Sequence, residues 1–408
     1  MKFILILFVL LFNLSIKTDT QKYKLPQNEE LKLNAKSHIL MDFDSGEILY
    51  SHNEEEKLYP ASMTKMMGML LVLEAIDENR LNWNDIVEGS ETSSSMGGTQ
   101  IFLAPNEKMS VDDLFKAVAI NSANDAIVAL GEKVSGNIDS FIDLMNKKAK
   151  ELNMVNTNFK NATGFDNEEH YTTAKDMAIL ARNLLKHGED VLRYTRMKEA
   201  YIRKDTANPF WLVSTNKLLG NYEGLDGLKT GFTNKAGYNL TATAYRKGVR
   251  LISVIMCAKT IKERSQDTVT LLNYGFSKVK AIEIFDQDTS LATFTFKNAL
   301  TKDTKLYPKE KINPVFPINV KAEDLDYKIV ITKSSAPLKA NDVVGYLVIS
   351  YNDITRNYDV VIKEDVLTKG YFDYFFEYLK LQYIYLLHNK YYRLSFLMKY
   401  SFLLSLLF

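Results

Sequence analysis

Three short strings of polar residues, in a fixed order along the chain, constrain its fold and chemistry more than any other feature. They are Ser62-Met63-Thr64-Lys65, Ser122-Ala123-Asn124 and Lys229-Thr230-Gly231. If one fold brings them together, they supply a nucleophile, a base and polar groups that can hold a peptide substrate. The sequence therefore predicts acyl transfer through a covalent ester on a serine.

The order and context of the strings carry this prediction, because single strings recur by chance. Ser-x-x-Lys also begins at Ser214 and Ser277, whereas Lys-Thr-Gly occurs once. Ser-x-Asn begins at several other serines: Ser51, Ser135, Ser214 and Ser350. We expect the first string at the start of a helix, the second in a break between helices and the third on a strand.

The first string lies where a helix is expected to begin. Pro60 suits a first helical turn, and apolar residues recur after it at helical spacing: Met63, Met66, Met67, Leu70 and Leu71. A lysine three residues after a serine lies on the same helix face, about 5–6 Å away. Lys65 can therefore act as general base for Ser62 if its amine is neutral. Lowering its pKa from about 10.4 to about 7 needs ~4–5 kcal/mol, from burial or from a second cation such as Lys229.

The second string falls between two expected helices. Ser110 begins a capping pattern that predicts a helix to Ile120, and a second helix is expected over residues 125–134. In the break between them, Ser122 can relay protons and Asn124 can donate to a substrate carbonyl. The alternative is that these residues only cap the helices.

The third string lies in a glycine-rich run between Gly227 and Gly231. Glycines weaken a strand but let another backbone approach it closely, as a peptide added at a sheet edge would. Thr230 can hydrogen-bond the terminal carboxylate of such a peptide while Lys229 supplies positive charge. The alternative is a plain β-bulge.

The overall composition excludes several classes of function. The 408 residues include 51 basic and 50 acidic ones, so the chain lacks the electrostatic footprint of a nucleic-acid binder. Its single cysteine, Cys257, excludes an intramolecular disulfide and is expected to pack in a buried strand. The five histidines show no metal-ligand spacing, and no metal or other cofactor is predicted.

Both ends of the chain suggest targeting. Lys2 precedes an apolar run from Phe3 to Phe12 that continues, past Asn13, to Ile16, which predicts a signal peptide over residues 1–20. No Ala-x-Ala site follows, so an uncleaved anchor is one alternative. A buried strand is the other. Residues 371–408 are rich in aromatics and leucine, but charges interrupt them before about 20 apolar residues accumulate. This pattern favours an amphipathic helix on a membrane surface, and the alternative is a helix packed on the protein.

Several further segments extend the similarity beyond the three strings, and together they resemble a D-alanyl-D-alanine carboxypeptidase of the low-molecular-mass penicillin-binding proteins. The resemblance covers roughly residues 33–366. Besides the strings, it rests on these segments: Tyr59-Pro60-Ala61-Ser62, Asn121-Ser122-Ala123-Asn124-Asp125, Asn161-Ala162-Thr163-Gly164-Phe165, His170-Tyr171-Thr172-Thr173-Ala174-Lys175-Asp176-Met177 and Gly227-Leu228-Lys229-Thr230-Gly231.

The resemblance implies a reaction and a place for it. Ser62 would attack the carbonyl between two D-alanines of a peptidoglycan stem pentapeptide, and backbone N–H groups of Ser62 and Phe232 would form the oxyanion hole. Asn124, Lys229, Thr230 and Gly231 would bind the substrate, and β-lactams would acylate the same serine. The expected location is the outer face of a bacterial cell membrane, attached through the carboxyl-terminal segment.

The chain departs from the family pattern at two places and leaves one residue ambiguous. Phe232 stands where some relatives carry histidine, which removes a side-chain role but not a backbone one. The family also uses a downstream basic residue for the substrate carboxylate, and Lys259 and Arg264 are both candidates. His170 fits loop structure or catalysis, and loop structure is favoured.

Two rival functions use the same strings. A class A β-lactamase carries a deacylating glutamate with asparagine four residues later, whereas Thr172 and Thr173 follow Glu168 and Glu169 at that spacing. A penicilloyl-binding sensor or scaffold with little turnover would keep the strings unchanged. The lysines argue against it only weakly.

The expected architecture has three parts after the signal peptide. Residues 33–275 are expected to form an α/β domain of the serine β-lactamase/transpeptidase type, with an antiparallel sheet flanked by helices. Alternating apolar and polar residues with interspersed prolines predict a small all-β domain over residues 278–366. The amphipathic segment 371–408 follows.

Overall fold

The structure is a computed structural model that describes residues 31–301 and 303–388. These residues divide into two compact units. The first unit takes residues 31–282 and 314–320, and the second takes the remainder. All three strings belong to the first unit, whereas the segment 1–20 lies outside the described residues.

A five-stranded antiparallel sheet, in the order β2-β1-β9-β8-β7, forms the centre of the first unit. The strands are β1 (Ser37–Asp42), β2 (Ile48–His52), β7 (Leu225–Thr233), β8 (Gly237–Arg246) and β9 (Val249–Ala258). Strands β1 and β2 form a hairpin, with His38 opposite His52. β7 carries the Lys-Thr-Gly string and is an edge strand, so one side of its backbone is unpaired within the sheet.

The turn between β8 and β9 contains two residues. Arg246 pairs with Val249, so only Lys247 and Gly248 form the turn. Both have positive φ, 49° and 84°, as two-residue hairpin turns require.

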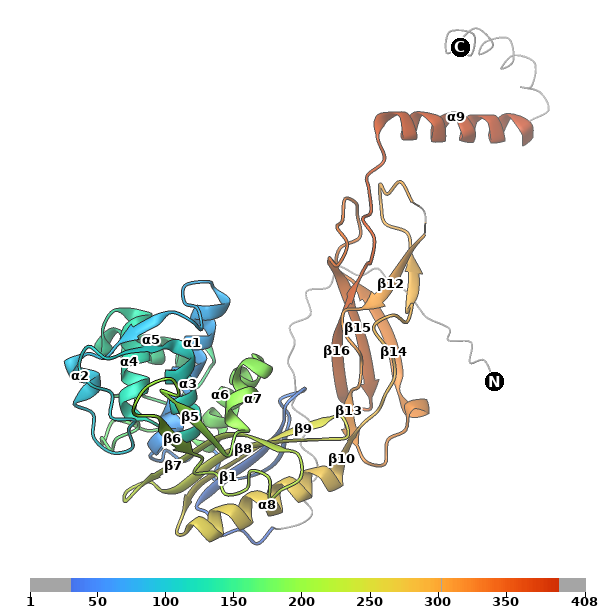
Figure 1. Cartoon of the computed structure of the whole chain (residues 1–408). Helices are drawn as coiled ribbons and strands as arrows, with labels where there is room; N and C mark the ends of the chain where they lie inside the picture. The colour runs from blue at the N-terminus through green and yellow to red at the C-terminus, as the bar shows by residue number, and fades with distance from the viewer. Residues whose placement is uncertain (1–30, 302, 389–408) are drawn as a thin grey trace. The chain divides into compact units, whose positions relative to one another are not determined.

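Helices cover both faces of this sheet (Figure 1). The helices of the first unit are α1 (Lys65–Asp77), α2 (Glu91–Ser94), α3 (Val111–Asn121), α4 (Asn124–Ser135), α5 (Ile138–Glu151), α6 (Ala174–Leu185), α7 (Glu189–Thr195) and α8 (Ile261–Lys278). Because side chains alternate along a strand, β1 sends Ile39 into the core that contains α1 and α6, and Leu40 into the core formed with α8. The sheet is therefore buried on both faces.

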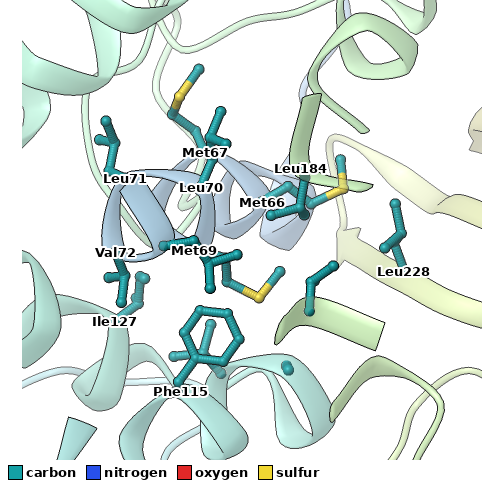
Figure 2. Close-up of a cluster of buried hydrophobic side chains, with 14 of the residues drawn as sticks. Met66, Met67, Met69, Leu70, Leu71, Val72, Phe115, Ile127, Leu184 and Leu228 are labelled. Atoms are coloured by element: carbon teal, nitrogen blue, oxygen red, sulfur yellow. The ribbon is translucent and has the colours of Figure 1, made fainter. Parts of the chain in front are cut away.

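Helix α1 is buried on every side over most of its length. Its residues from Lys65 to Leu73 are all buried. Figure 2 shows its methionines and leucines directed at several surrounding elements, with Phe115 of α3 and Ile127 of α4 on one side. The helix that follows Ser62 is thus fixed by packing from all directions.

Shorter strands complete the first unit in three antiparallel pairs: β3 (Ile86–Glu88) with β4 (Lys108–Ser110), β5 (Glu199–Ile202) with β6 (Phe210–Val213), and β10 (Val279–Ala281) with β13 (Val315–Pro317). The last pair brings residues 314–320 back to the first unit after a long excursion. Nothing in the local sequence predicts this pairing, because its two strands are far apart along the chain.

The second unit contains a five-stranded antiparallel sheet and a helix. The sheet order is β11-β12-β16-β15-β14, and its elements are β11 (Ala292–Phe294), β12 (Thr304–Pro308), β14 (Asp326–Ile331), β15 (Val343–Tyr351) and β16 (Ile354–Val361). A short 3₁₀ turn, η2 (Ala322–Asp324), precedes β14. Helix α9 (Tyr371–His388) follows the sheet along the chain.

Helix α9 exposes many large apolar side chains. They are Tyr371, Phe372, Tyr374, Phe375, Phe376, Tyr378, Leu381, Tyr383, Ile384 and Tyr385. Across residues 31–301 and 303–388, no helix combines the length and the apolar character that crossing a bilayer requires. Residues 389–408, the rest of the predicted membrane segment, lie outside the described part.

Phe115 tests how strongly the core around α1 supports the first unit. Its ring is fully buried, so Phe115→Ala should lower the free energy of unfolding by about 3–5 kcal/mol through lost apolar burial and a new cavity. Phe102→Ala removes the same atoms from a ring that is 68% exposed and should cost far less. Calorimetric unfolding of both variants measures the difference; equal losses would contradict this account of the core.

Candidate active site

Ser62 lies in a tight turn just before α1. The turn is a 3₁₀ segment, η1 (Ala61–Thr64), and α1 begins at Lys65 rather than at Pro60 as expected. Met63 N donates to the Pro60 carbonyl at 3.2 Å. Ala61 has a φ of +48°, a left-handed conformation that a non-glycine residue adopts at a cost of about 1–2 kcal/mol. The structure therefore holds Ser62, which is half-buried, at the head of a fixed helix.

The Lys65 amine reaches the Ser62 hydroxyl. Lys65 Nζ lies 3.0 Å from Ser62 Oγ and donates to the Thr163 carbonyl at 2.7 Å. Lys65 is completely buried and forms no ion pair in the described part of the chain. A neutral amine at this distance can accept the proton of the serine hydroxyl.

Burial and a second lysine favour that neutral form. Burial lowers the pKa of Lys65 well below its ordinary value, and repulsion by Lys229 lowers it further, while Asp125 acts in the opposite direction. The pKa of Lys229 itself is lowered to about 7, first by burial and then by the charge of Arg264. The structure thus brings together the two lysines that the sequence connected only by hypothesis.

The loop that follows α5 forms another wall of the site. Asn161 Oδ1 accepts hydrogen bonds from Thr163 N, Gly164 N and the Thr163 hydroxyl, which turns the Thr163 carbonyl toward Lys65. Gly164 has a φ of +90°, and a Cβ there would collide with the Ala61 carbonyl. Only glycine permits this close approach to the turn at residues 60–64 that carries Ser62, the nucleophile turn.

The second string occupies the break between α3 and α4, as expected. Ser122 ends α3 with a φ of +68°, and its buried Oγ has no hydrogen-bond partner in the described residues. A buried hydroxyl without a partner is available for proton transfer or for a bound substrate. Asn124 is also buried, and its Nδ2 donates to the Gly97 carbonyl at 2.7 Å.

The third string lies on β7, with Lys229 and Thr230 both buried. Lys229 Nζ donates to the Thr230 carbonyl at 3.1 Å, and the Thr230 hydroxyl forms a short hydrogen bond with that of Thr215. Phe232, which follows the string, is exposed and stacks on Tyr238 with ring centroids 4.3 Å apart.

The glycines on either side of Lys229 leave space that other parts of this chain enter. A Cβ at Gly231 would lie 2.7 Å from the Pro60 carbonyl oxygen, and one at Gly227 would lie 2.8 Å from Thr195 Oγ1. Gly231 thus receives another backbone, as the sequence predicted, whereas Gly227 receives a threonine side chain. Gly231 in particular lets the nucleophile turn pack directly on β7.

The structure separates two pairs of alternatives. Arg264 is buried and its charge lowers the pKa of Lys229, whereas Lys259 is exposed, so the structure favours Arg264 as the downstream basic candidate. His170 Nδ1 accepts a hydrogen bond from Lys160 N, and its Nε2 lies 2.8 Å from Thr64 Oγ1. Burial lowers the pKa of His170 to about 4, so this imidazole is neutral and anchors its loop.

Cys257 differs from its expected surroundings. It lies on β9 as predicted, but it is half-buried rather than buried and has a φ of +59°. Among the described residues, no three His, Cys, Asp or Glu side chains are grouped to hold a metal ion.

Sequence reasoning missed the residues that shape the site without belonging to a string. The Thr163 carbonyl accepts a hydrogen bond from Lys65, and the absence of a side chain at Gly164 lets its loop approach Ala61. The charge of Asp125 raises the pKa of Lys65, and the Thr215 hydroxyl bonds to that of Thr230. The one local signal was Asn161 followed by Thr163 and Gly164, which favours a turn in which the asparagine side chain bonds the following backbone.

Comparisons with known proteins agree with this arrangement. A family model described as D-alanyl-D-alanine carboxypeptidase matches residues 23–260. The D-alanyl-D-alanine carboxypeptidase DacF of Bacillus subtilis is 41% identical over 350 residues, which are 85% of this chain and 89% of the relative.

Solved structures extend the agreement to the fold. Penicillin binding protein 5 from Haemophilus influenzae matches with a TM-score of 0.67 and 29% identity, over 83% of this chain and 99% of its own. Penicillin-binding protein D2 from Listeria monocytogenes, in its ampicillin-bound form, matches with a TM-score of 0.55 and 36% identity, over 61% of this chain and 99% of its own. The expected sheet with flanking helices is thus confirmed, and the chain belongs to the D-alanyl-D-alanine carboxypeptidase family.

Proposed function

We propose that this protein is a serine-type D-Ala-D-Ala carboxypeptidase that removes the terminal D-alanine from peptidoglycan stem pentapeptides and is inhibited by β-lactams. The observation that carries the proposal is the buried Lys65 amine, 3.0 Å from Ser62 Oγ and next to the charge of Lys229. Family membership and the ampicillin-bound relative support the substrate class and the inhibitor class.

In the acylation step, neutral Lys65 takes the hydroxyl proton as Ser62 Oγ attacks the carbonyl carbon between the two D-alanines. The backbone N–H groups of Ser62 and Phe232 stabilise the oxyanion of the tetrahedral intermediate. The proton then passes to the leaving amine, with Ser122 as relay, and the C–N bond breaks. Terminal D-alanine departs and an ester remains on Ser62.

In the deacylation step, water replaces the departed amine. Lys65 accepts a proton from the water as its oxygen attacks the ester carbonyl, and the same proton returns to Ser62 when the ester C–O bond breaks. A β-lactam enters by the first step, but its leaving amine stays attached through the opened ring. The amine then remains in the path of water, so we expect slow release of the inhibitor.

Substrate binding is assigned to the edge of the sheet and to the helix break. The free side of β7 offers backbone groups to an extended peptide, and Lys229 with Thr230 and Gly231 faces its terminal carboxylate. Asn124 donates an amide hydrogen to a substrate carbonyl from the opposite wall. Arg264 adds positive charge behind Lys229.

The remaining parts of the chain are assigned to placing the enzyme. Residues 1–20 direct export and residues 33–275 form the catalytic domain. The small all-β spacer domain, expected over residues 278–366, is assigned to residues 283–313 and 321–366, because residues 278–282 and 314–320 belong to the first unit. Residues 371–408 attach the protein to the outer face of the membrane. The exposed aromatic side chains of α9 support the last assignment, because aromatic rings favour the membrane interface.

Replacement of the nucleophile tests the proposed reaction directly. Ser62→Ala removes the attacking oxygen, so D-alanine release from diacetyl-Lys-D-Ala-D-Ala and covalent labelling by penicillin should each fall at least ~10³-fold. Ser253→Ala is the matched control, because the Ser253 hydroxyl is also buried and has no hydrogen-bond partner among the described residues. Full activity of the Ser62 variant would refute the mechanism.

The unmodified protein distinguishes the rival functions in the same assay. Sustained D-alanine release that penicillin blocks is the expected result. A stable penicilloyl adduct without peptide turnover would favour a sensor or scaffold, and rapid penicillin hydrolysis would favour a β-lactamase.

The pH dependence of acylation tests the role of the lysine pair. Acylation should fall as acid protonates Lys65, and Lys229→Met should move this acidic limb to higher pH. The sign follows because Lys229 lowers the pKa of Lys65, so removing its charge raises that pKa. Rates of penicillin acylation across pH measure the shift, with the exposed Lys235→Met as control. An unmoved limb would remove Lys229 from this electrostatic role.

Truncation tests the membrane assignment. A chain that ends at residue 370 should lose binding to vesicles of anionic phospholipid but keep D-alanine release, because α9 lies outside the catalytic unit. Co-sedimentation of the full and shortened chains with vesicles measures the difference. Equal retention would move the attachment elsewhere in the chain.

A further inference from the structure

Asn239 makes an unusual set of contacts beneath the nucleophile turn. It lies on β8 opposite Gly231 and is completely buried. Its Nδ2 donates to the carbonyl oxygens of Tyr59 at 2.9 Å and Pro60 at 3.3 Å. Its Oδ1 accepts from Cys257 N at 2.8 Å. One amide thus joins three backbone groups from two distant segments. The orientation of the amide is assigned from these partners, because carbonyl oxygens need the Nδ2 donor and the N–H group needs the Oδ1 acceptor.

A β-bulge aims this side chain. The register of β8 and β9 shifts between Tyr238 and Leu240, so Asn239 faces an irregular stretch of β9. Cys257 lies in that stretch with a φ of +59°, and its N–H bonds to the Asn239 side chain. Bulges commonly occur beside active sites, where they redirect a side chain. Here the redirected side chain points toward the residues that precede Ser62.

The turn needs such support because its backbone is strained. Ala61 is left-handed, and Asn239 holds the two carbonyls immediately before it. Gly231 lets β7 touch the Pro60 carbonyl, and Gly164 approaches the Ala61 carbonyl from another direction. Of these contacts, the Asn239 amide alone supplies hydrogen-bond donors to the Tyr59 and Pro60 carbonyls from a side chain.

We propose that Asn239 is a positioning residue for Ser62, which acts through the Tyr59 and Pro60 carbonyls to hold the hydroxyl in reach of Lys65. The proposal rests on the function proposed above. In the described structure the side-chain hydrogen bonds of Asn239 all go to backbone groups of this chain, so its effect is on the rate of attack rather than on binding.

Loss of the amide should slow acylation without weakening the preceding complex. Asn239→Leu keeps a similar volume and removes all three hydrogen bonds, which frees the turn to move. Because a misplacement of about 1 Å can cost about 10²-fold in rate, the acylation rate constant for penicillin should fall by about that factor. The dissociation constant of the initial, noncovalent penicillin complex should stay within about threefold.

Stopped-flow acylation by penicillin at several concentrations separates these two constants, and thermal unfolding reports stability. Asn137→Ala is the matched control for a purely structural effect, because the Asn137 side chain caps α5 by accepting from Ser140 N. It should lower the melting temperature and leave the acylation constant unchanged. Asn239→Ala is the second variant if the leucine variant does not fold. It leaves space for a water molecule to donate to the carbonyls, so its loss should be smaller but in the same constant.

The outcomes are distinct. A lower acylation constant in a folded Asn239 variant, with the affinity retained and the Asn137 control unaffected, supports the proposal. An unchanged acylation constant, or a loss confined to affinity, overturns it while the proposed function stands. If penicillin fails to acylate the unmodified protein, the proposed function is overturned and this inference with it.

Discussion

The burial of an amine beside a serine hydroxyl is the constraint on which the rest of the structure depends. Water would keep the Lys65 amine charged, and a charged amine accepts no proton. The fold removes the water by surrounding α1 on every side and then places Lys229 nearby, which further lowers the pKa of Lys65. Hydrogen bonding to the Thr163 carbonyl aims the amine at Ser62. Packing and electrostatics therefore serve the same end.

The central sheet supports the turn that carries Ser62 and ends at the edge strand β7. The Pro60–Met63 turn packs on β7 through the space that Gly231 leaves open, and the Asn239 amide of β8 lies beneath it. The outer side of β7 has no neighbouring strand in the sheet. One strand thus supports the turn that carries Ser62 and, in the function proposed above, also binds an extended peptide along its unpaired edge. The same geometry explains why the lysine of the third string lies so close to that of the first.

Features set by local spacing were predictable from the sequence, and features set by distant contacts were not. The pairing of Ser62 with Lys65 follows from a separation of three residues, and the break at Ser122 from the polar residues between two helices. The strained backbone at Ala61 and the bulge at Cys257 depend on residues more than a hundred positions away or on another strand. The same limit applies to Gly231. Its sequence context predicted that another backbone approaches the strand closely there, but not that the Pro60 carbonyl does so.

The most direct test of the account is the ionisation of Lys65 itself. NMR of protein labelled with carbon-13 at the lysine ε-carbons follows each amine through a pH titration, and the Lys65→Ala variant identifies the Lys65 signal by its loss. The account predicts a Lys65 signal that titrates well below the ordinary lysine range, because the amine is buried and Lys229 repels its charge. A Lys65 signal that titrates in the ordinary range would contradict the account.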